Sequence, residues 1–420
     1  MSPGGFRSGG SPFRRNVGAT SVALALAQGG QLAMLYPISR IFDPAELGLF
    51  GAFAAVVLVA AACSTARFEM AIPTSRSGRE RRSLVVLCAA MAAMVGIVAA
   101  ATSPGWAPQP LREWIGTPWI VLFWLPMVAL DDVFRVALQR EGRFTAPAVA
   151  LIVRSVGSLG LALAIGVLQG PTPAALLIGA ATGTAASMLL QAAALARRIG
   201  LRPVSLRELR LVARRNRQCP IMLLPGHAAL TIATQGPVYA IEAIVGPAAA
   251  GSFLMAQRIL FQPVQFVSGA LAQAFFPEAA RRYRAAGECW SLYRKALLLL
   301  AACAVPVLLL ATPAGPALVD WVLGAKWAEA GAFAQVLAIA AAIRLLDAPL
   351  SSIRLVAGRY GFDLIWKASL MASVMIASTI GATAGGGLGA VIGLAISLSI
   401  LHSASLAFAI RLARGVGAAR

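Results

Sequence analysis

Apolar residues fill most of this chain in long stretches, and short polar segments separate them. Twelve stretches contain about 18 or more mostly apolar residues, the length that a helix needs to cross a bilayer core. They lie near residues 17–36, 48–66, 83–102, 117–136, 146–168, 173–196, 219–244, 248–275, 294–312, 329–350, 364–383 and 387–410. The pattern predicts an all-α integral membrane protein with twelve transmembrane helices.

Composition supports this class and argues against nucleic-acid binding. Hydrophobic residues make up 59% of the chain and charged residues 12%, whereas soluble domains contain roughly 25% charged residues. The net charge of +20 comes from basic residues in short runs between apolar segments, which is the pattern that orients membrane helices. No platform of aromatic and basic residues supports binding of a nucleic acid.

The distribution of basic residues also predicts the orientation. If the amino terminus lies in the cytoplasm and the helices alternate, Lys and Arg fall almost entirely on the cytoplasmic side. The exceptions are Arg40, Arg112 and Lys326 in outer loops, and Arg154 and Arg258 inside the membrane. Both termini are therefore expected in the cytoplasm.

An internal repeat divides the chain into two parts. The sequence IFDPAELGLFGAF at 41–53 reappears as IVGPAAAGSFLMA at 244–256, 203 residues later. A second pair of similar segments is EGRFTAP at 141–147 and AGRYGFD at 357–363. Chance similarity between helices rich in small residues is the alternative explanation.

The repeat predicts two six-helix bundles, one in residues 1–196 and one in 219–420. The basic segment 197–218 joins them and is expected in the cytoplasm. Because six is an even number, both bundles enter the membrane in the same direction, and their pseudo-two-fold axis lies along the membrane normal.

Sequence signatures of catalysis are missing. The chain contains no P-loop, no HExxH motif and no nucleophile elbow, and its five cysteines lack metal-binding spacing. His227 and His402 each stand alone in an apolar helix, where we expect hydrogen-bonded packing residues, with a proton relay as the alternative. We therefore expect a transporter without catalytic residues, metal or cofactor.

Intramembrane arginines indicate what the transporter binds. A guanidinium group in a membrane prefers an anion, above all a phosphate that it can hold in a bidentate fork. Arg258, Gln262 and Gln265 fall on one broad helix face, which predicts a polar cavity wall; hydrogen bonding between helices is the alternative. Arg154 is either a second ligand or a side chain that extends to the cytoplasmic end of its helix.

Glycine and proline residues mark two helices as candidates for bending. Gly29 and Gly30 interrupt the first span, and Pro225, Gly236 and Pro237 interrupt the seventh. We expect these five residues to act in gating as the cavity switches sides of the membrane. Static kinks are the alternative.

Two segments resemble a known family. YPISRIFDPAELGLFGAF followed by RFEMAIP at 67–73 resembles the opening of the oligosaccharidyl-lipid flippases, which translocate O-antigen and capsule repeat units. They belong to the multidrug/oligosaccharidyl-lipid/polysaccharide exporter superfamily. AGSFLMAQRILFQPVQFVSGALAQAFFPEAARR at 250–282 is similar to the eighth helix of these proteins and of lipid II flippases.

The resemblance implies a flippase of the bacterial inner membrane that moves undecaprenyl-diphosphate-linked oligosaccharides from the cytoplasmic to the periplasmic leaflet by alternating access. It places Arg258 close to the diphosphate, and it implies polysaccharide polymerases and glycosyltransferases as partners beside membrane lipids. The second span lacks the arginine of lipid II flippases, which favours the repeat-unit branch. A multidrug exporter of the superfamily and a non-transporting scaffold of a polysaccharide assembly complex stay open.

Overall fold

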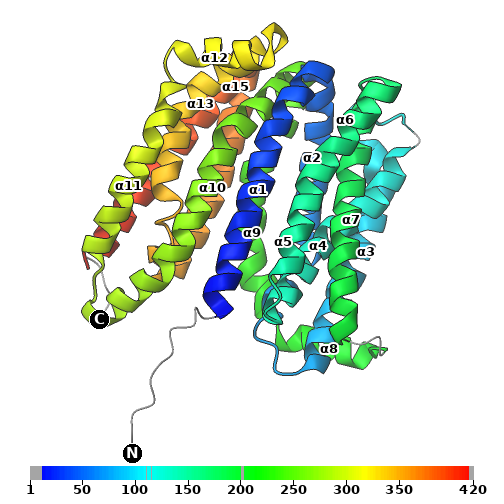
Figure 1. The fold of residues 1–420 in the computed structure, drawn as a ribbon, viewed down its shortest axis with the longest axis vertical. Coiled ribbons are helices and arrows are strands. Elements are labelled where there is room, and N and C mark those ends of the chain that lie inside the picture. Colours follow the sequence, from blue (N-terminus) through cyan, green and yellow to red (C-terminus); the bar gives the residue numbers. More distant parts are fainter. Residues whose placement is uncertain (1–11, 110, 115, 200–202, 416–420) are drawn as a thin grey trace, which may run out of the picture.

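The computed structural model describes residues 12–109, 111–114, 116–199 and 203–415, and all regular elements in these residues are helices (Figure 1). In chain order the elements are α1 (Pro12–Ile41), α2 (Pro44–Ser64), η1 (Phe68–Ala71), α3 (Gly78–Trp106), α4 (Gly116–Arg140), α5 (Thr145–Ile152), η2 (Val153–Gly157), α6 (Ser158–Gln169), α7 (Pro173–Ile199), α8 (Leu206–Arg215), η3 (Cys219–Leu223), α9 (Leu224–Ile244), α10 (Pro247–Ala286), α11 (Trp290–Leu309), α12 (Ala314–Leu323), η4 (Ala325–Trp327), α13 (Ala328–Asp347), α14 (Ile353–Val356) and α15 (Tyr360–Ala413). The predicted all-α class is confirmed. The predicted cytoplasmic ends, 1–11 and 416–420, lie outside the described residues.

Each expected span coincides with a helical segment, although several boundaries differ. By length and composition, seven of the described helices are apolar enough to cross a membrane, so the membrane class holds while the count of twelve stays a prediction. α15 covers two expected spans. A kink separates them, since the backbone leaves the helical region at Gly385 and Gly386. Gly386 has a φ of 61°, a conformation that glycine adopts without strain. The expected loop around 313–328 instead folds into α12 and η4.

Two separate hydrophobic cores hold the helices together. One core contains buried residues between Ala233 and Ala413, from α9 to α15, and the other lies between α2, α3, α4 and α7. A third cluster joins them where α1 and α2 meet α10 and α12. In Figure 1 the α10–α15 group lies on the left, α3 to α7 lie on the right, and α1 runs between them. The division into 1–196 and 219–420 stays a prediction.

The residues that match in the repeat pack against each other. A Cβ atom added to Gly48 of α2 would lie 1.8 Å from the carbonyl oxygen of Pro247, and one added to Gly251 of α10 would lie 1.7 Å from that of Pro44. The contact is therefore reciprocal, as a two-fold relation between the helices requires. Only glycine lets two helix backbones approach so closely.

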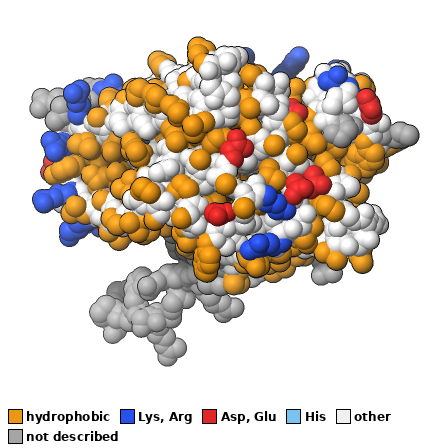
Figure 2. Space-filling view, turned by 90° about the horizontal axis from the view of Figure 1, so that it is seen from above, with side chains coloured by type: hydrophobic (Ala, Val, Ile, Leu, Met, Phe, Trp, Pro, Cys, Tyr) orange, Lys and Arg blue, Asp and Glu red, His pale blue; other side chains and the backbone are white. Residues whose placement is uncertain are grey.

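The basic segments lie together at one end of the molecule. α8 begins with a capping box formed by Ser205 and Glu208. The ion pair between Arg79 and Glu208, at 2.6 Å, joins it to α3, as does the pair between Arg215 and Glu80, at 3.4 Å. Figure 2 looks onto the opposite end, where basic and acidic side chains lie scattered among hydrophobic ones. This asymmetry fits the proposed cytoplasmic location of the α8 end.

Replacing Gly48 by alanine should loosen the crossing of α2 and α10, because the new methyl group meets backbone atoms that have little room to move. Overpacking of this kind costs about 1–3 kcal/mol. Thermal unfolding of the detergent-purified protein should show a lower midpoint for Gly48→Ala. The control is Gly160→Ala, since nothing lies within 4 Å of a Cβ atom there. Equal midpoints for the two variants would contradict the crossing.

Cysteines introduced at Arg76, Arg214 and Arg284 in a cysteine-free background should resist a membrane-impermeant thiol reagent in intact cells. All three side chains are exposed and belong to the basic segments. A cysteine at the exposed Asp320 of α12 should react, because it lies at the other end of the molecule. The reverse labelling pattern would invert the proposed orientation.

Candidate functional site

A cavity of about 510 Å³ opens between α9, α10, α13, α14 and α15. Its wall extends from Leu230 to His402 in sequence, so all lining residues belong to the carboxyl-terminal part of the chain. Two such halves predict a cavity between them, with Arg258 facing it. The cavity instead lies within the second group of helices, because α14 and the first part of α15 close it from the side.

The predicted polar face of α10 forms one wall. Arg258, Gln262 and Gln265 all line the cavity, together with Gln257. The side chain of Arg258 is half-buried, and it forms no ion pair or hydrogen bond with the described residues. The Oε1 atom of Gln262 is buried without a hydrogen-bond partner. The wall therefore offers a cation and amide groups that are free to bind a ligand.

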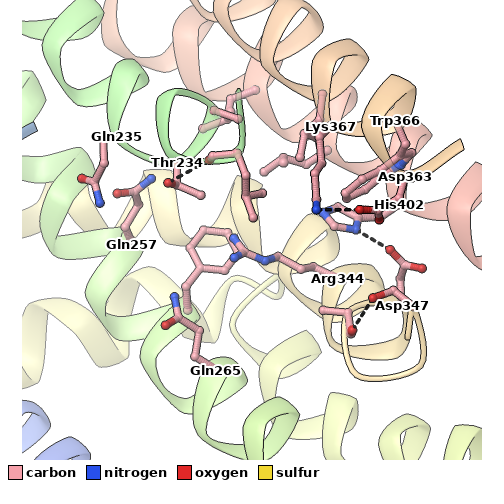
Figure 3. Close-up of a pocket in the computed structure, with 18 of the residues that line it drawn as sticks. Thr234, Gln235, Gln257, Gln265, Arg344, Asp347, Asp363, Trp366, Lys367 and His402 are labelled. Carbon is pink, nitrogen blue, oxygen red and sulfur yellow. Dashed lines mark hydrogen bonds and ion pairs between the residues drawn. The ribbon is translucent and has the colours of Figure 1, made fainter. Parts of the chain in front are cut away.

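A second arginine reaches the cavity from α13. The guanidinium carbon of Arg344 lies 5.0 Å from the ring centre of Phe261, and none of the described carboxylates pairs with it. In Figure 3, Gln257 and Gln265 lie on one side of Arg344, and Asp347 and His402 lie on the other. Arg344 and Arg258 thus face the same space from two helices.

The acidic groups of the cavity are already paired. Asp347 accepts a hydrogen bond of 2.7 Å from Ser405, and its other oxygen lies 2.8 Å from Nδ1 of His402. Asp363 pairs with the buried Arg354 at 3.2 Å and with Lys367 at 2.6 Å. Because both carboxylates are engaged, the positive charge of Arg258 and Arg344 dominates the open part of the cavity. The arrangement suits an anion with several acceptor oxygens.

Sequence reasoning missed much of this wall. It counted Arg344, Arg354 and Lys367 among the basic residues of the cytoplasmic side and did not predict that all three line the cavity. One signal was present: Arg344 lies inside the expected span 329–350, six residues before its end. The inward fold of α14, which brings Arg354 into the bundle, has no comparable sequence signal.

Arg154 lies outside the cavity lining and has a different partner. It belongs to η2, a π-helical turn, and its Nη1 atom lies 2.8 Å from Oδ2 of Asp131. Ser187 and Gln191 of α7 donate to the other oxygen of Asp131, each at 2.5 Å. The side chain of Asp131 is only 5% exposed, so α4 carries a buried carboxylate. A substrate role for Arg154 stays a prediction without support from this cavity.

The five proposed gating residues lie where α1 and α9 pack on other helices or bend. Gly30 faces Val156 of η2, and Gly236 faces Met375 of α15, while Gly29 has open space around it. Pro225 stands at the start of α9, directly after the π-helical turn η3, and Pro237 lies buried inside α9. α1 continues through Pro37 to Ile41 rather than ending at the proline. Gating by these residues stays a prediction.

Substitution of Arg154 distinguishes its two possible roles. Arg154→Ala should lower the stability of the purified protein by about 1–3 kcal/mol, because the buried Asp131 loses its charged partner. The double variant Asp131→Asn/Arg154→Ala should regain part of this loss in thermal unfolding. Loss of function at unchanged stability would instead indicate a ligand role for Arg154.

Comparison with known proteins places the chain in a family. The model of a family described as polysaccharide biosynthesis protein matches residues 38–332, and no curated protein matches the sequence. The fold is similar to the lipid II flippase MurJ in an inward closed conformation, with a TM-score of 0.75, 11% identity, and coverage of 93% of this chain and 87% of that one.

Multidrug transporters share the fold as well. An inward-facing transporter of the MATE family in the MOP superfamily gives a TM-score of 0.65 at 15% identity, covering 94% of this chain and 95% of that one. A MOP-superfamily transporter from Pyrococcus furiosus gives 0.59 at 13% identity, with 97% of both chains covered. The fold is thus that of the MOP transporters, and the protein belongs to the polysaccharide biosynthesis protein family.

Proposed function

We propose that this protein is a flippase that moves undecaprenyl-diphosphate-linked oligosaccharides from the cytoplasmic to the periplasmic leaflet of the bacterial inner membrane. One observation carries the proposal: Arg258 and Arg344 face a single cavity, and neither has a carboxylate partner among the described residues. A buried charge is costly unless a ligand or counter-ion compensates it. An anionic substrate supplies that compensation.

A lipid diphosphate fits the chemistry of this cavity. Two guanidinium groups can each hold a phosphate in a bidentate fork, and the amides of Gln257, Gln262 and Gln265 can donate to further oxygens or to sugar hydroxyls. The volume of about 510 Å³ lies in the range of small-molecule sites. The head group would occupy the cavity while the apolar polyprenyl chain stays in the bilayer.

Alternating access would proceed by relative movement of the two helix groups. The reciprocal contact of Gly48 and Gly251 supports a pivot at the α2–α10 crossing. Gly29 and Gly30 of α1, with Pro225, Gly236 and Pro237 of α9, would then absorb the bending.

The multidrug exporter is the second candidate function, and one observation favours it. Asp131 is a buried carboxylate in the first helix group, where an exporter could bind a coupling cation. Its oxygens, however, already interact with Arg154, Ser187 and Gln191. The described residues offer no separate site for a scaffold role, which would also leave the unpaired Arg258 and Arg344 unexplained.

The decisive experiment measures surface polysaccharide in a deletion strain that carries each variant. Arg258→Ala and Arg344→Ala should each lower export at least about tenfold, because a hydrogen bond to a charged group contributes about 1.5–3 kcal/mol. Arg258→Lys should retain part of the activity, since lysine keeps the charge and loses the fork. Lipid-linked oligosaccharide should accumulate inside the cells.

Arg281→Ala is the matched control. Arg281 lies on α10 as Arg258 does, but its side chain is exposed and pairs with Glu278 outside the cavity. All variants should reach the membrane at normal level. Full export by Arg258→Ala and Arg344→Ala would overturn the proposal, and altered drug resistance with normal export would favour the multidrug exporter.

A further inference from the structure

The structure contains two buried carboxylate clusters with the same plan. Asp131 lies late in α4, binds Ser187 and Gln191 of α7, and pairs with Arg154. Asp347 ends α13, binds His402 and Ser405 of α15, and lies 4.0 Å from Arg354. In each cluster the aspartate contacts two side chains that lie about one turn apart on a single helix. One arginine also lies near each aspartate.

Sequence numbering relates the two clusters. Asp131 and Asp347 are 216 positions apart. The similar segments EGRFTAP at 141–147 and AGRYGFD at 357–363 are separated by the same number of positions. The aspartates therefore occupy equivalent places in the two copies of the repeat. Their common role is to join three helix segments, which any strong acceptor at this position can do.

The two clusters differ in one chemical property. The partners of Asp131 on α7 are a hydroxyl and an amide, and neither binds a proton near neutral pH. In the second cluster an imidazole, His402, stands among the partners. His402 also lines the cavity, whereas none of the residues of the Asp131 cluster does. The copy that faces the candidate substrate site is thus the copy with a group that can exchange a proton.

Charged groups surround His402 on several elements. α13 supplies Arg344 and Asp347, and α14 supplies Arg354. From α15 come Asp363 and Lys367, together with the edge of the Trp366 ring, whose centre lies 5.3 Å from that of the imidazole. α10 contributes Arg258 across the cavity, α9 contributes the uncharged Thr234 and Gln235, and Tyr293 of α11 interacts electrostatically with Asp347.

These charges predict how a ligand affects the imidazole. Basic groups outnumber acidic ones around the cavity, so protonation of His402 adds positive charge to a site that already has an excess. A diphosphate bound to Arg258 and Arg344 removes that excess. Protonated His402 keeps its Nδ1–H bond to Asp347, and its Nε2 gains a hydrogen that can be donated.

We infer that His402, held by Asp347, is a proton-binding site coupled to the substrate: it takes up a proton when a diphosphate enters the cavity and releases it when the diphosphate leaves. The coupling rests on the proposed function, because it needs an anionic ligand at Arg258 and Arg344. Since coupling between two ligands is reciprocal, lower pH must also strengthen diphosphate binding.

The protonation of His402 can be followed directly, first without and then with a diphosphate ligand. The chain contains two histidines, so ¹⁵N-histidine NMR of the full-length protein in lipid nanodiscs gives the signals of two imidazole rings, and the ring whose signals are lost in His402→Gln is that of His402. Addition of geranyl diphosphate should shift the titration of this signal to higher pH and leave that of His227 nearly unchanged. An unchanged titration of His402 would overturn the inference.

Calorimetry tests the coupling from the side of the ligand. Binding of geranyl diphosphate, measured in buffers of different ionisation enthalpy, should show proton uptake in the wild type that is absent in His402→Gln. When the pH is lowered from 8 to 6, the affinity for geranyl diphosphate should rise at least about fivefold more in the wild type than in the variant. A factor of about five is the lower end of the coupling usually found between two ligands. The titration of the probe's own phosphate cancels in this comparison.

Two substitutions of His402 control for a loss of structure. His402→Gln copies the residue type of Gln191 in the first cluster, and His402→Asn places an amide nitrogen near the position of Nδ1. Equal pH dependence in the wild type and both variants would refute the proton site while leaving the flippase intact. If the wild type fails to bind the probe at any pH, the proposed function fails and the coupling with it.

Discussion

A charge buried among apolar helices must find a partner, and this constraint organises the polar chemistry of the protein. Asp131 meets Arg154, and Arg354 lies between Asp347 and Asp363. These groups compensate one another, so they join helices without demanding a ligand. Arg258 and Arg344 break the pattern, because they share a cavity and no described carboxylate reaches either of them. The paired cations and the cations that we propose as ligand-binding thus differ in their partners rather than in their burial.

The backbone crossing of α2 and α10 determines where this chemistry can occur. Gly48 and Gly251 bring the two helices into backbone contact, which fixes the height and rotation of α10. The position seven residues after each glycine then differs between the copies. Ala55 is buried in the packed core of α2, whereas Arg258 turns toward the cavity. The same crossing therefore supports close packing on one helix and a cavity wall on the other.

Sequence patterns predicted the helical class, the approximate limits of the spans and the polar face of α10, because these depend on local periodicity. They also identified Gly48 and Gly251 as equivalent, since a duplicated crossing leaves a duplicated motif. The cavity wall from Arg344 to Lys367 could not be predicted in the same way. Whether Arg354 faces the cytoplasm or the bundle depends on how α14 turns inward, and Asp347 and His402, 55 residues apart, meet only through tertiary packing.

Divergence between the two copies shows which half carries the proposed chemistry. Where the first copy has Ala55, the second has Arg258; where Asp131 is held by a hydroxyl and an amide from one helix, Asp347 is held by an imidazole and a hydroxyl. Each change replaces an uncharged side chain by a basic one, and both new groups face the same cavity. Arg258 supplies a permanent positive charge and His402 one that depends on pH. A scaffold that only had to hold helices together would gain nothing from either change, whereas a site that must bind an anion and then release it needs both a fixed and an adjustable charge.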